Sequence, residues 1–293
     1  MSRMIAYWLC LRPQQWVKNL VVFVPLVFGL KLMDASLVLR AAGAFFAFSF
    51  LASATYIFND ISDMPEDQKH PAKKLRPIAA GKVSLAHVRI LGWMLLAAGL
   101  ILGAGIKKEL GVVLLAYLAL NVLYTRVLKS VVIVDVFTLA LFYVLRIVAG
   151  TVVTEVPYSF WMISEMILLA MFLGFNKRRQ EIRFAEKSPD EFRHVLSKYN
   201  LYFIDQMIST ISSSLVVVYM FYCVDVHTVA RFGTRRLIAS IPFVYYGIFR
   251  YLYLMHKGKM GEDPTRVLLK DKMMQLNLTA WILVCVVAIY FTR

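Results

Sequence analysis

Cysteine and histidine are scarce in this sequence of 293 residues, and their placement excludes two kinds of site. The 3 cysteines, Cys10, Cys223 and Cys285, lie far apart in apolar surroundings, so they predict neither a disulfide framework nor a zinc site. The 5 histidines are equally scattered and indicate no histidine-based metal site. Any metal site that we predict must therefore rest on carboxylates.

Acidic residues are also in the minority. The chain has 18 Asp and Glu against 33 Lys and Arg, which gives a net charge of +15. Part of such an excess follows from membrane topology, because Lys and Arg accumulate in cytoplasmic loops. The charge alone therefore does not identify a substrate, and we predict no nucleic-acid partner.

Apolar residues are abundant. They make up 60% of the chain, and the mean hydropathy of +0.65 is too high for a soluble globular protein. Nine stretches are long and apolar enough to span a bilayer. We predict an all-α polytopic membrane protein, a single domain over residues 1–293, with transmembrane helices near residues 17–33, 36–58, 84–106, 110–128, 131–150, 159–176, 202–226, 237–255 and 273–291.

Residues 1–16 precede the first of these stretches. They contain Tyr7, Trp8 and Trp16, aromatic residues that favour a membrane interface, and we expect no cleavable signal there. Most Lys and Arg then lie on the side of the N-terminus, which predicts a cytoplasmic N-terminus. The cytoplasmic connections would be 59–83, 177–200 and 256–272, with one or two amphipathic surface helices in the second.

The stretch 59–81 concentrates acids at the end of an apolar run. At about 100° per residue, Asp60, Asp63 and Asp67 fall within an arc of about 60° on a helix. Pro65 indicates that this helix ends near Met64. Carboxylates are unfavourable at a helix C-terminus inside a membrane, whereas Mg²⁺ prefers such oxygen ligands. A magnesium site is our prediction, and an acidic cytoplasmic loop is the alternative.

Two further segments carry charge at membrane spans. Asp135 and Arg146 lie within about 20° of the same helical face but about 16 Å apart along it, so they could line one cavity. The alternative is that each has a separate structural partner. Residues 177–179 are three consecutive cations at the end of a span. They suit phosphate binding, and equally the helix dipole and the positive-inside rule.

Several motifs together resemble the UbiA-type intramembrane prenyltransferase superfamily, and within it the decaprenyl-phosphate phosphoribosyltransferase branch. They are RPQQWVKN at 12–19, NDISDMPED at 59–67, HPAKKLRPIAAGKVS at 70–84, YTRVLKSVVIVDV at 124–136, LRIVAG at 145–150, KRRQE at 177–181 and EDPTRVLLKD at 262–271. The resemblance implies nine transmembrane helices around a central cavity that opens toward the cytoplasm and the lipid. A second D-x-x-x-D motif, common in that superfamily, is absent after the sixth span.

The resemblance also implies a magnesium-dependent transfer from a diphosphate donor. We expect phosphoribosyl diphosphate as donor and a polyprenyl phosphate as acceptor, in the inner (plasma) membrane with the site facing the cytoplasm. A homo-oligomer is possible, and the sequence does not determine the oligomeric state. The alternatives are a prenyl diphosphate:aromatic acceptor transferase and an anionic-lipid transporter without chemistry. The predicted metal-binding and catalytic residues are Asp60, Asp63 and Asp67, and the predicted substrate-binding residues are Lys18, Asn59, Lys69, Lys74, Arg76, Tyr124, Lys129, Asp135, Arg146, Lys177, Arg178 and Arg179.

Overall fold

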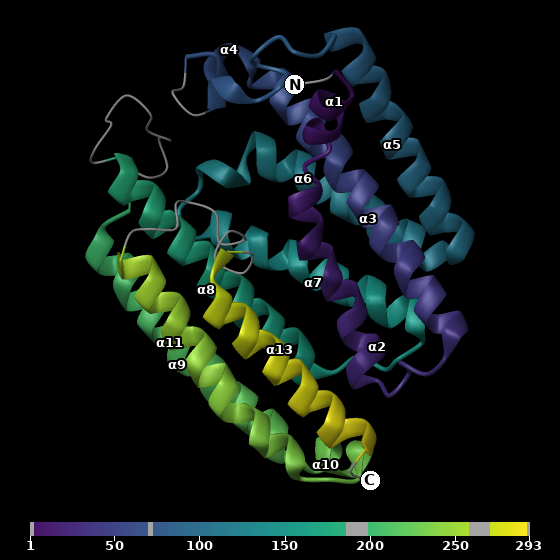
Figure 1. Ribbon diagram of the computed structural model, residues 1–293, viewed down its shortest axis with the longest axis vertical. Coiled ribbons are helices and arrows are strands. Elements are labelled where there is room, and N and C mark those ends of the chain that lie inside the picture. Colours follow the sequence, from purple (N-terminus) through teal and green to yellow (C-terminus); the bar gives the residue numbers. More distant parts are fainter. Residues whose placement is uncertain (1–2, 70–72, 186–198, 258–269, 292–293) are drawn as a thin grey trace. The chain divides into compact units, whose positions relative to one another are not determined.

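The computed structural model describes residues 3–69, 73–185, 199–257 and 270–291, and the regular elements in these ranges are all helices (Figure 1). The predicted all-α class is confirmed. The chain divides into two compact units, residues 1–123 with 145–157, and residues 124–144 with 158–293. The single-domain prediction stays a prediction. The surface helices expected between 176 and 200 fall mostly on residues 186–198, which lie outside the described residues.

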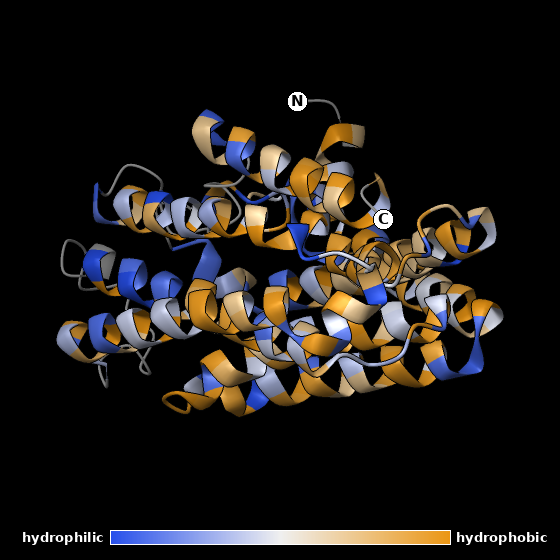
Figure 2. Ribbon diagram, turned by 90° about the horizontal axis from the view of Figure 1, so that it is seen from below, coloured by the Kyte–Doolittle hydropathy of each residue, from blue (hydrophilic) through white to orange (hydrophobic). Residues whose placement is uncertain are grey.

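Eight helices in the described part are long and apolar enough to cross a membrane. Hydrophobic residues run along the bodies of the long helices, and hydrophilic residues gather at helix ends and connections (Figure 2). Each of the eight overlaps one of the predicted spans. They are α3 (Ala35–Ser62), α5 (Leu85–Ile106), α6 (Lys108–Arg126), α7 (Val134–Thr154), α8 (Phe160–Ala185), α9 (Leu201–Val224), η6 with α11 (Arg236–Ser240 and Ile241–Lys257), and α13 with η7 (Lys272–Val286 and Val287–Phe291).

The first predicted span, 17–33, takes a different form. The 3₁₀ helix η1 (Pro13–Phe23) is followed by the short α2 (Val24–Phe28), so there is no long α-helix in this segment. Pro25 stands in the first turn of α2 and has no backbone N–H, so it cannot donate back into η1. The count of nine transmembrane helices therefore stays a prediction.

In the first unit, α3 packs along α5, and η1 packs on α3. Asp34 caps α3, because its side chain accepts hydrogen bonds from the backbone N–H groups of Ser36 and Leu37. Two glycines permit close approach of neighbouring segments. A Cβ at Gly99 of α5 would lie 2.1 Å from a Leu51 methyl carbon, and a Cβ at Gly150 of α7 would lie 2.3 Å from the Val22 carbonyl oxygen.

In the second unit, α8 packs on α9, and α11 packs on both α9 and α13. Their apolar side chains form one buried cluster that includes Phe172, Phe175, Ile204 and Tyr251. The connection from α9 to η6 contains the short α10 (Val226–Phe232), which ends at Gly233 with φ +67°. This packing holds the charged C-terminal half of α8 in place.

Candidate active site

The acidic motif lies in the first unit, where α3 gives way to α4 (Met64–Asp67). Asp60 in the last turn of α3 is 6% exposed, and Asp67 in α4 is 4% exposed. One nitrogen of Arg76, Nη1, donates to Asp60 Oδ1 at 3.1 Å and to Asp67 Oδ2 at 2.6 Å. Two buried carboxylates from separate helices therefore share the guanidinium of Arg76.

This pair fits a divalent cation. Hard ions such as Mg²⁺ take one or two protein carboxylates and complete their shell with water and phosphate oxygens. Asp63, the C-cap of α3, is exposed instead of joining the pair. Within the described residues, no group of three or more His, Cys, Asp or Glu side chains is arranged to hold a metal ion. The structure thus brings together two of the three predicted metal ligands, and Asp63 as a ligand stays a prediction.

A second arginine contacts the same site. Arg12 Nη2 donates to Asp60 Oδ1 at 2.5 Å, and the Arg12 guanidinium lies 4.9 Å from the centre of the Tyr56 ring. Arg12 has a left-handed backbone (φ 50°) just before Pro13, so the turn between α1 (Arg3–Cys10) and η1 directs it to α3. Burial, with the Asp60 carboxylate, raises the pKa of the neighbouring Cys10 to about 11, which keeps this thiol neutral.

A second polar cluster, the Arg178 network, lies in the other unit. Arg178 in α8 is 1% exposed, and its Nε donates to Asp135 Oδ2 at 2.6 Å. Its other nitrogens donate to Glu181 one turn further along and to the Tyr124 hydroxyl at 3.3 Å. Two acids therefore compensate one buried guanidinium, a condition that a charge in a membrane interior requires.

Tyr199 completes this network. Its hydroxyl donates to Asp135 Oδ1 at 2.7 Å and accepts the Ile133 N–H at 2.6 Å. Ile133 has φ 70°, a conformation that a β-branched residue rarely adopts. Burial and the hydrogen bond to Asp135 raise the pKa of the Tyr199 phenol, so it stays a donor at neutral pH. The segment before α7 is thereby tied to the start of α9.

The two cations beside Arg178 have different surroundings. Arg179 is 5% exposed and pairs through Nε with Asp205 of α9 at 2.5 Å. Lys177 is partly exposed, and its Nζ lies 3.9 Å from Glu181 Oε1. One turn before Arg179, Asn176 is fully buried. Three consecutive predicted substrate-binding residues therefore have three different surroundings.

Arg146 of α7 belongs to the first unit. Its Nε donates to Asn19 Oδ1 at 2.7 Å, its Nη2 donates to the Tyr117 hydroxyl at 3.4 Å, and its guanidinium lies 5.7 Å from the centre of the Phe48 ring. Arg146 and Asp135 thus contact different residues, as in the alternative of separate structural partners. A common cavity for the two stays a prediction.

A match to a known protein family shows to which family this chain belongs. Residues 20–278 match the model described as the UbiA prenyltransferase family, which is more than half of the chain. The chain belongs to the UbiA prenyltransferase family. It is therefore a transferase and an integral multi-pass membrane protein.

Named relatives of this UbiA-family chain are similar to it over most of its length. The decaprenyl-phosphate phosphoribosyltransferase of Mycobacterium tuberculosis is 32% identical, over 96% of this chain and 93% of that protein. The Mycolicibacterium smegmatis protein of the same name is 30% identical, over 96% and 91%. The UbiA homologue from Archaeoglobus fulgidus bound to GPP and Mg²⁺ has a TM-score of 0.69 at 17% identity, over 97% of this chain and 96% of that one. This likeness confirms the fold.

The other predicted residues of the UbiA motifs lie at several depths. Lys18 and Tyr124 are half-buried, as is Asn59 beside Asp60. Lys69, Lys74 and Lys129 are exposed.

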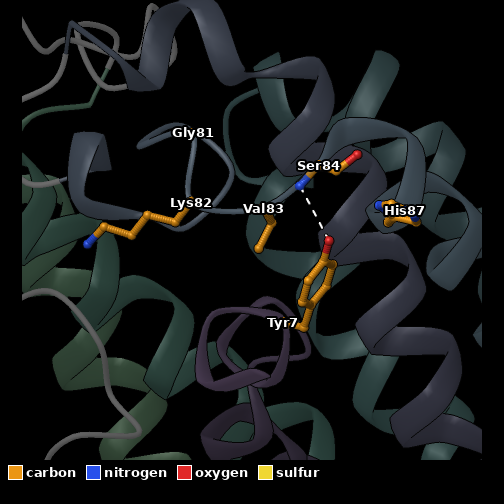
Figure 3. A pocket seen from close by; sticks show the side chains of 6 residues that line it. All are labelled: Tyr7, Gly81, Lys82, Val83, Ser84 and His87. Carbon is orange, nitrogen blue, oxygen red and sulfur yellow. Dashed lines mark hydrogen bonds between the residues drawn. The ribbon is translucent and has the colours of Figure 1, made fainter. Parts of the chain in front are cut away.

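A surface pocket of about 630 Å³ lies beside α1 and the start of α5 (Figure 3). The Ser84 N–H donates there to the Tyr7 hydroxyl at 3.4 Å, but the Lys82 and His87 side chains point apart, so its polar groups do not converge.

Several residues of these networks are not among the predicted site residues. Arg12 is bonded to Asp60, 48 positions away, and Tyr199 to Asp135, 64 positions away. Asn19 is the partner of Arg146 across 127 positions. Arg12 and Asn19 both lie in the RPQQWVKN motif, and this motif was the one sequence feature that could have indicated them. Nothing in the local pattern singled out Tyr199.

Proposed function

We propose that this chain transfers 5-phosphoribose from phosphoribosyl diphosphate to a polyprenyl phosphate and releases diphosphate. The observation that carries the proposal is that the buried carboxylates of Asp60 and Asp67 both contact Arg76 and so lie close together. Two such carboxylates would hold the divalent cation that a diphosphate leaving group needs. Support for the sugar donor comes from the relatives named decaprenyl-phosphate phosphoribosyltransferase, which match almost end to end.

Asp60 and Asp67 would hold Mg²⁺, with Asp63 as a further ligand. When bound, the ion supplies charge neutralisation and a template for the leaving diphosphate. Arg12 and Arg76 already contact these carboxylates, so they lie where they can share the negative charge. Lys69, Lys74 and Asn59 belong to the same segment and would contact the donor.

The reaction itself balances without a strong base. The bond between ribose C1 and the diphosphate oxygen breaks, and its electron pair leaves with diphosphate. Carbon C1 then has oxocarbenium character, as in other glycosyl transfers. A lipid phosphate oxygen donates an electron pair to form the new C1–O bond. This phosphate is already anionic at neutral pH, in accord with a predicted site that contains no histidine.

The remaining cations would hold the phosphates. Arg178 has its charge compensated by Asp135 and Glu181, so we assign it a positioning role together with Tyr124. The residues left for the acceptor phosphate and the ribose 5-phosphate are Lys18, Lys129, Arg146, Lys177 and Arg179.

The product would be a lipid-linked phosphoribose for cell-envelope synthesis. We place the enzyme in the inner (plasma) membrane, with its site toward the cytoplasm. The bias of Lys and Arg supports this orientation.

The test is an assay of the full chain in lipid nanodiscs. Labelled phosphoribosyl diphosphate and decaprenyl phosphate are supplied with and without Mg²⁺, and the lipid product is measured. We expect a phosphoribosyl lipid that requires Mg²⁺. Parallel reactions contain a prenyl diphosphate and an aromatic acid. Prenylation of that acid without a phosphoribosyl lipid would overturn the proposal.

Two variants at adjacent positions distinguish the loss of a site carboxylate from the loss of any negative charge in this segment. Asp67→Asn removes a buried carboxylate and should lower product formation by at least about 100-fold, in the range found for groups that stabilise transition-state charge. Glu66→Gln removes an exposed carboxylate next to it and should leave the rate near that of the wild type. Equal losses in both would contradict the assignment.

A further inference from the structure

Two polar atoms on one face of α8 are buried and have no hydrogen-bond partner among the described residues. They are Asn176 Oδ1 and Arg179 Nη1. Asn176 is fully buried and Arg179 is 5% exposed, so solvent does not replace the missing partners. Buried polar groups are nearly always paired in native proteins, and an unpaired one calls for a ligand or an ordered water.

The orientation of both groups is fixed by their other atoms. Asn176 Nδ2 donates to the Phe172 carbonyl at 2.8 Å. Because that carbonyl accepts only a donor, the amide nitrogen must face it and Oδ1 must point elsewhere. Arg179 Nε and Nη2 both donate to Asp205, at 2.5 and 3.4 Å. These two bonds fix the orientation of the guanidinium plane, and Nη1 has no partner among the described residues.

The two residues also occupy neighbouring positions on one helix. Residues three apart on a helix lie about 60° apart around the axis and about 4.5 Å along it, on the same face. By contrast Gln180, the other buried amide of this turn, donates to the Met255 carbonyl of α11 at 2.7 Å. Adjacent positions on one face of α8 therefore carry an acceptor and a cationic donor, each without a hydrogen-bond partner among the described residues.

Their chemistry selects one class of ligand. Arg179 Nη1 suits an anionic phosphate oxygen. Asn176 Oδ1 can only accept, so it needs a donor, which a ligand hydroxyl supplies. A prenyl diphosphate has phosphate oxygens but no hydroxyl. A phosphorylated sugar has both groups within a few bonds of each other.

We propose that Asn176 and Arg179 form a subsite for the phosphorylated sugar, with a ring hydroxyl donating to Asn176 Oδ1 and a phosphate oxygen accepting from Arg179 Nη1. This inference rests on the proposed phosphoribosyl transfer and deepens it, since it assigns the choice of a sugar donor over a prenyl donor to these two side chains. A site that bonds a substrate hydroxyl rejects an analogue without one, because its own polar atom is then left unpaired.

Direct binding tests the subsite without catalysis. Ribose 5-phosphate and methyl phosphate, which has no hydroxyl, are titrated into the full chain in nanodiscs at pH 8 by calorimetry. The wild type should bind ribose 5-phosphate at least about tenfold more tightly than methyl phosphate. Asn176→Ser should remove most of this preference and leave the affinity for methyl phosphate unchanged. Arg179→Gln should weaken both ligands.

Controls exclude a general structural effect. Serine at 176 can still donate to the Phe172 carbonyl from within the helix, which favours folding. Asn176→Gln, which keeps both an amide donor and an acceptor oxygen, serves as a second variant if that protein does not fold, and it should retain the preference. Asn277→Ser alters a comparable amide, one that donates to the Phe243 carbonyl, and should change neither affinity.

The outcomes separate this inference from the proposed function. An unchanged preference in Asn176→Ser overturns the subsite, as does a wild type that binds the two probes equally. The transfer assay is then run on the same preparations. Failure to form a phosphoribosyl lipid overturns the proposed function, whereas normal transfer with an unchanged kcat/KM in Asn176→Ser overturns only the subsite.

Discussion

The Tyr199 hydroxyl donates to Asp135 while it accepts the backbone N–H of Ile133, two residues earlier in the chain. Asp135 in turn accepts from Arg178. One phenol therefore holds a segment in a strained left-handed conformation and orients the acid that compensates a buried arginine. The geometry makes Tyr199 a positioning residue for α8.

Tyr199→Phe should lower the free energy of unfolding by about 1–3 kcal/mol, because it leaves the Ile133 N–H and one Asp135 oxygen without this partner. Unfolding of the nanodisc or detergent sample by denaturant measures it. Tyr202→Phe is the matched control, since Tyr202 lies three residues further on, in the first turn of α9, and is 73% exposed. A loss of equal size in both variants would refute the role of Tyr199.

Arg76→Met should make stability depend on Mg²⁺. The substitution leaves Asp60 and Asp67 without a shared cation, and a bound divalent ion can take its place. Added Mg²⁺ should therefore raise the melting temperature of this variant more than that of the wild type. Arg89→Met, at an exposed position of α5, should respond as the wild type does. An identical response in all three proteins would argue against a metal at these carboxylates.

Acid should weaken the contact between α11 and α13. The Arg250 guanidinium donates to Asp271 at 2.8 and 3.2 Å and, as the main cause, lowers the pKa of that carboxyl. A carboxyl whose folded pKa is lowered stabilises the protein above its unfolded pKa of about 4, and this contribution is lost as the pH falls through the folded pKa.

Asp271→Asn keeps an oxygen to cap α13 through the Met274 N–H but removes the charge. Its free energy of unfolding should be lower than that of the wild type at pH 7, and the difference should shrink as the pH falls below about 4. Arg250→Gln should give the same loss, and the double variant should lose no more than either one. Additive losses would show that the two residues act separately.

Gly150→Ala should destabilise the first unit by about 1–3 kcal/mol. The added Cβ would meet the Val22 carbonyl oxygen at 2.3 Å and Pro25 at 2.9 Å, so α7 and η1 would have to separate. Gly105→Ala in α5 is the opposite case, because nothing lies within 4 Å of its Cβ. That change should stabilise the helix by up to about 1 kcal/mol. Thermal unfolding of the two variants compares the signs.

Hydropathy located most of the spans, because a bilayer interior accepts a backbone segment only when its hydrogen bonds close within a helix. The stretch 17–33 is apolar too, yet Pro25 interrupts the backbone ladder and the segment takes the form of η1 and α2. Spacing on one helix also predicted that Asp60 and Asp67 act together. It did not predict that Asp63 would be exposed, because that depends on the turn after Ser62.

The sequence by itself determined the membrane-spanning class, the family and the residues that carry charge into the apolar segments. Those features are local, since length, polarity and motif are read along the chain. Only the tertiary structure decided which charge meets which: Arg178 meets Asp135 across 43 positions, and Arg146 meets Asn19 across 127. A buried charge must find its partner wherever packing places one, and packing depends on every helix at once.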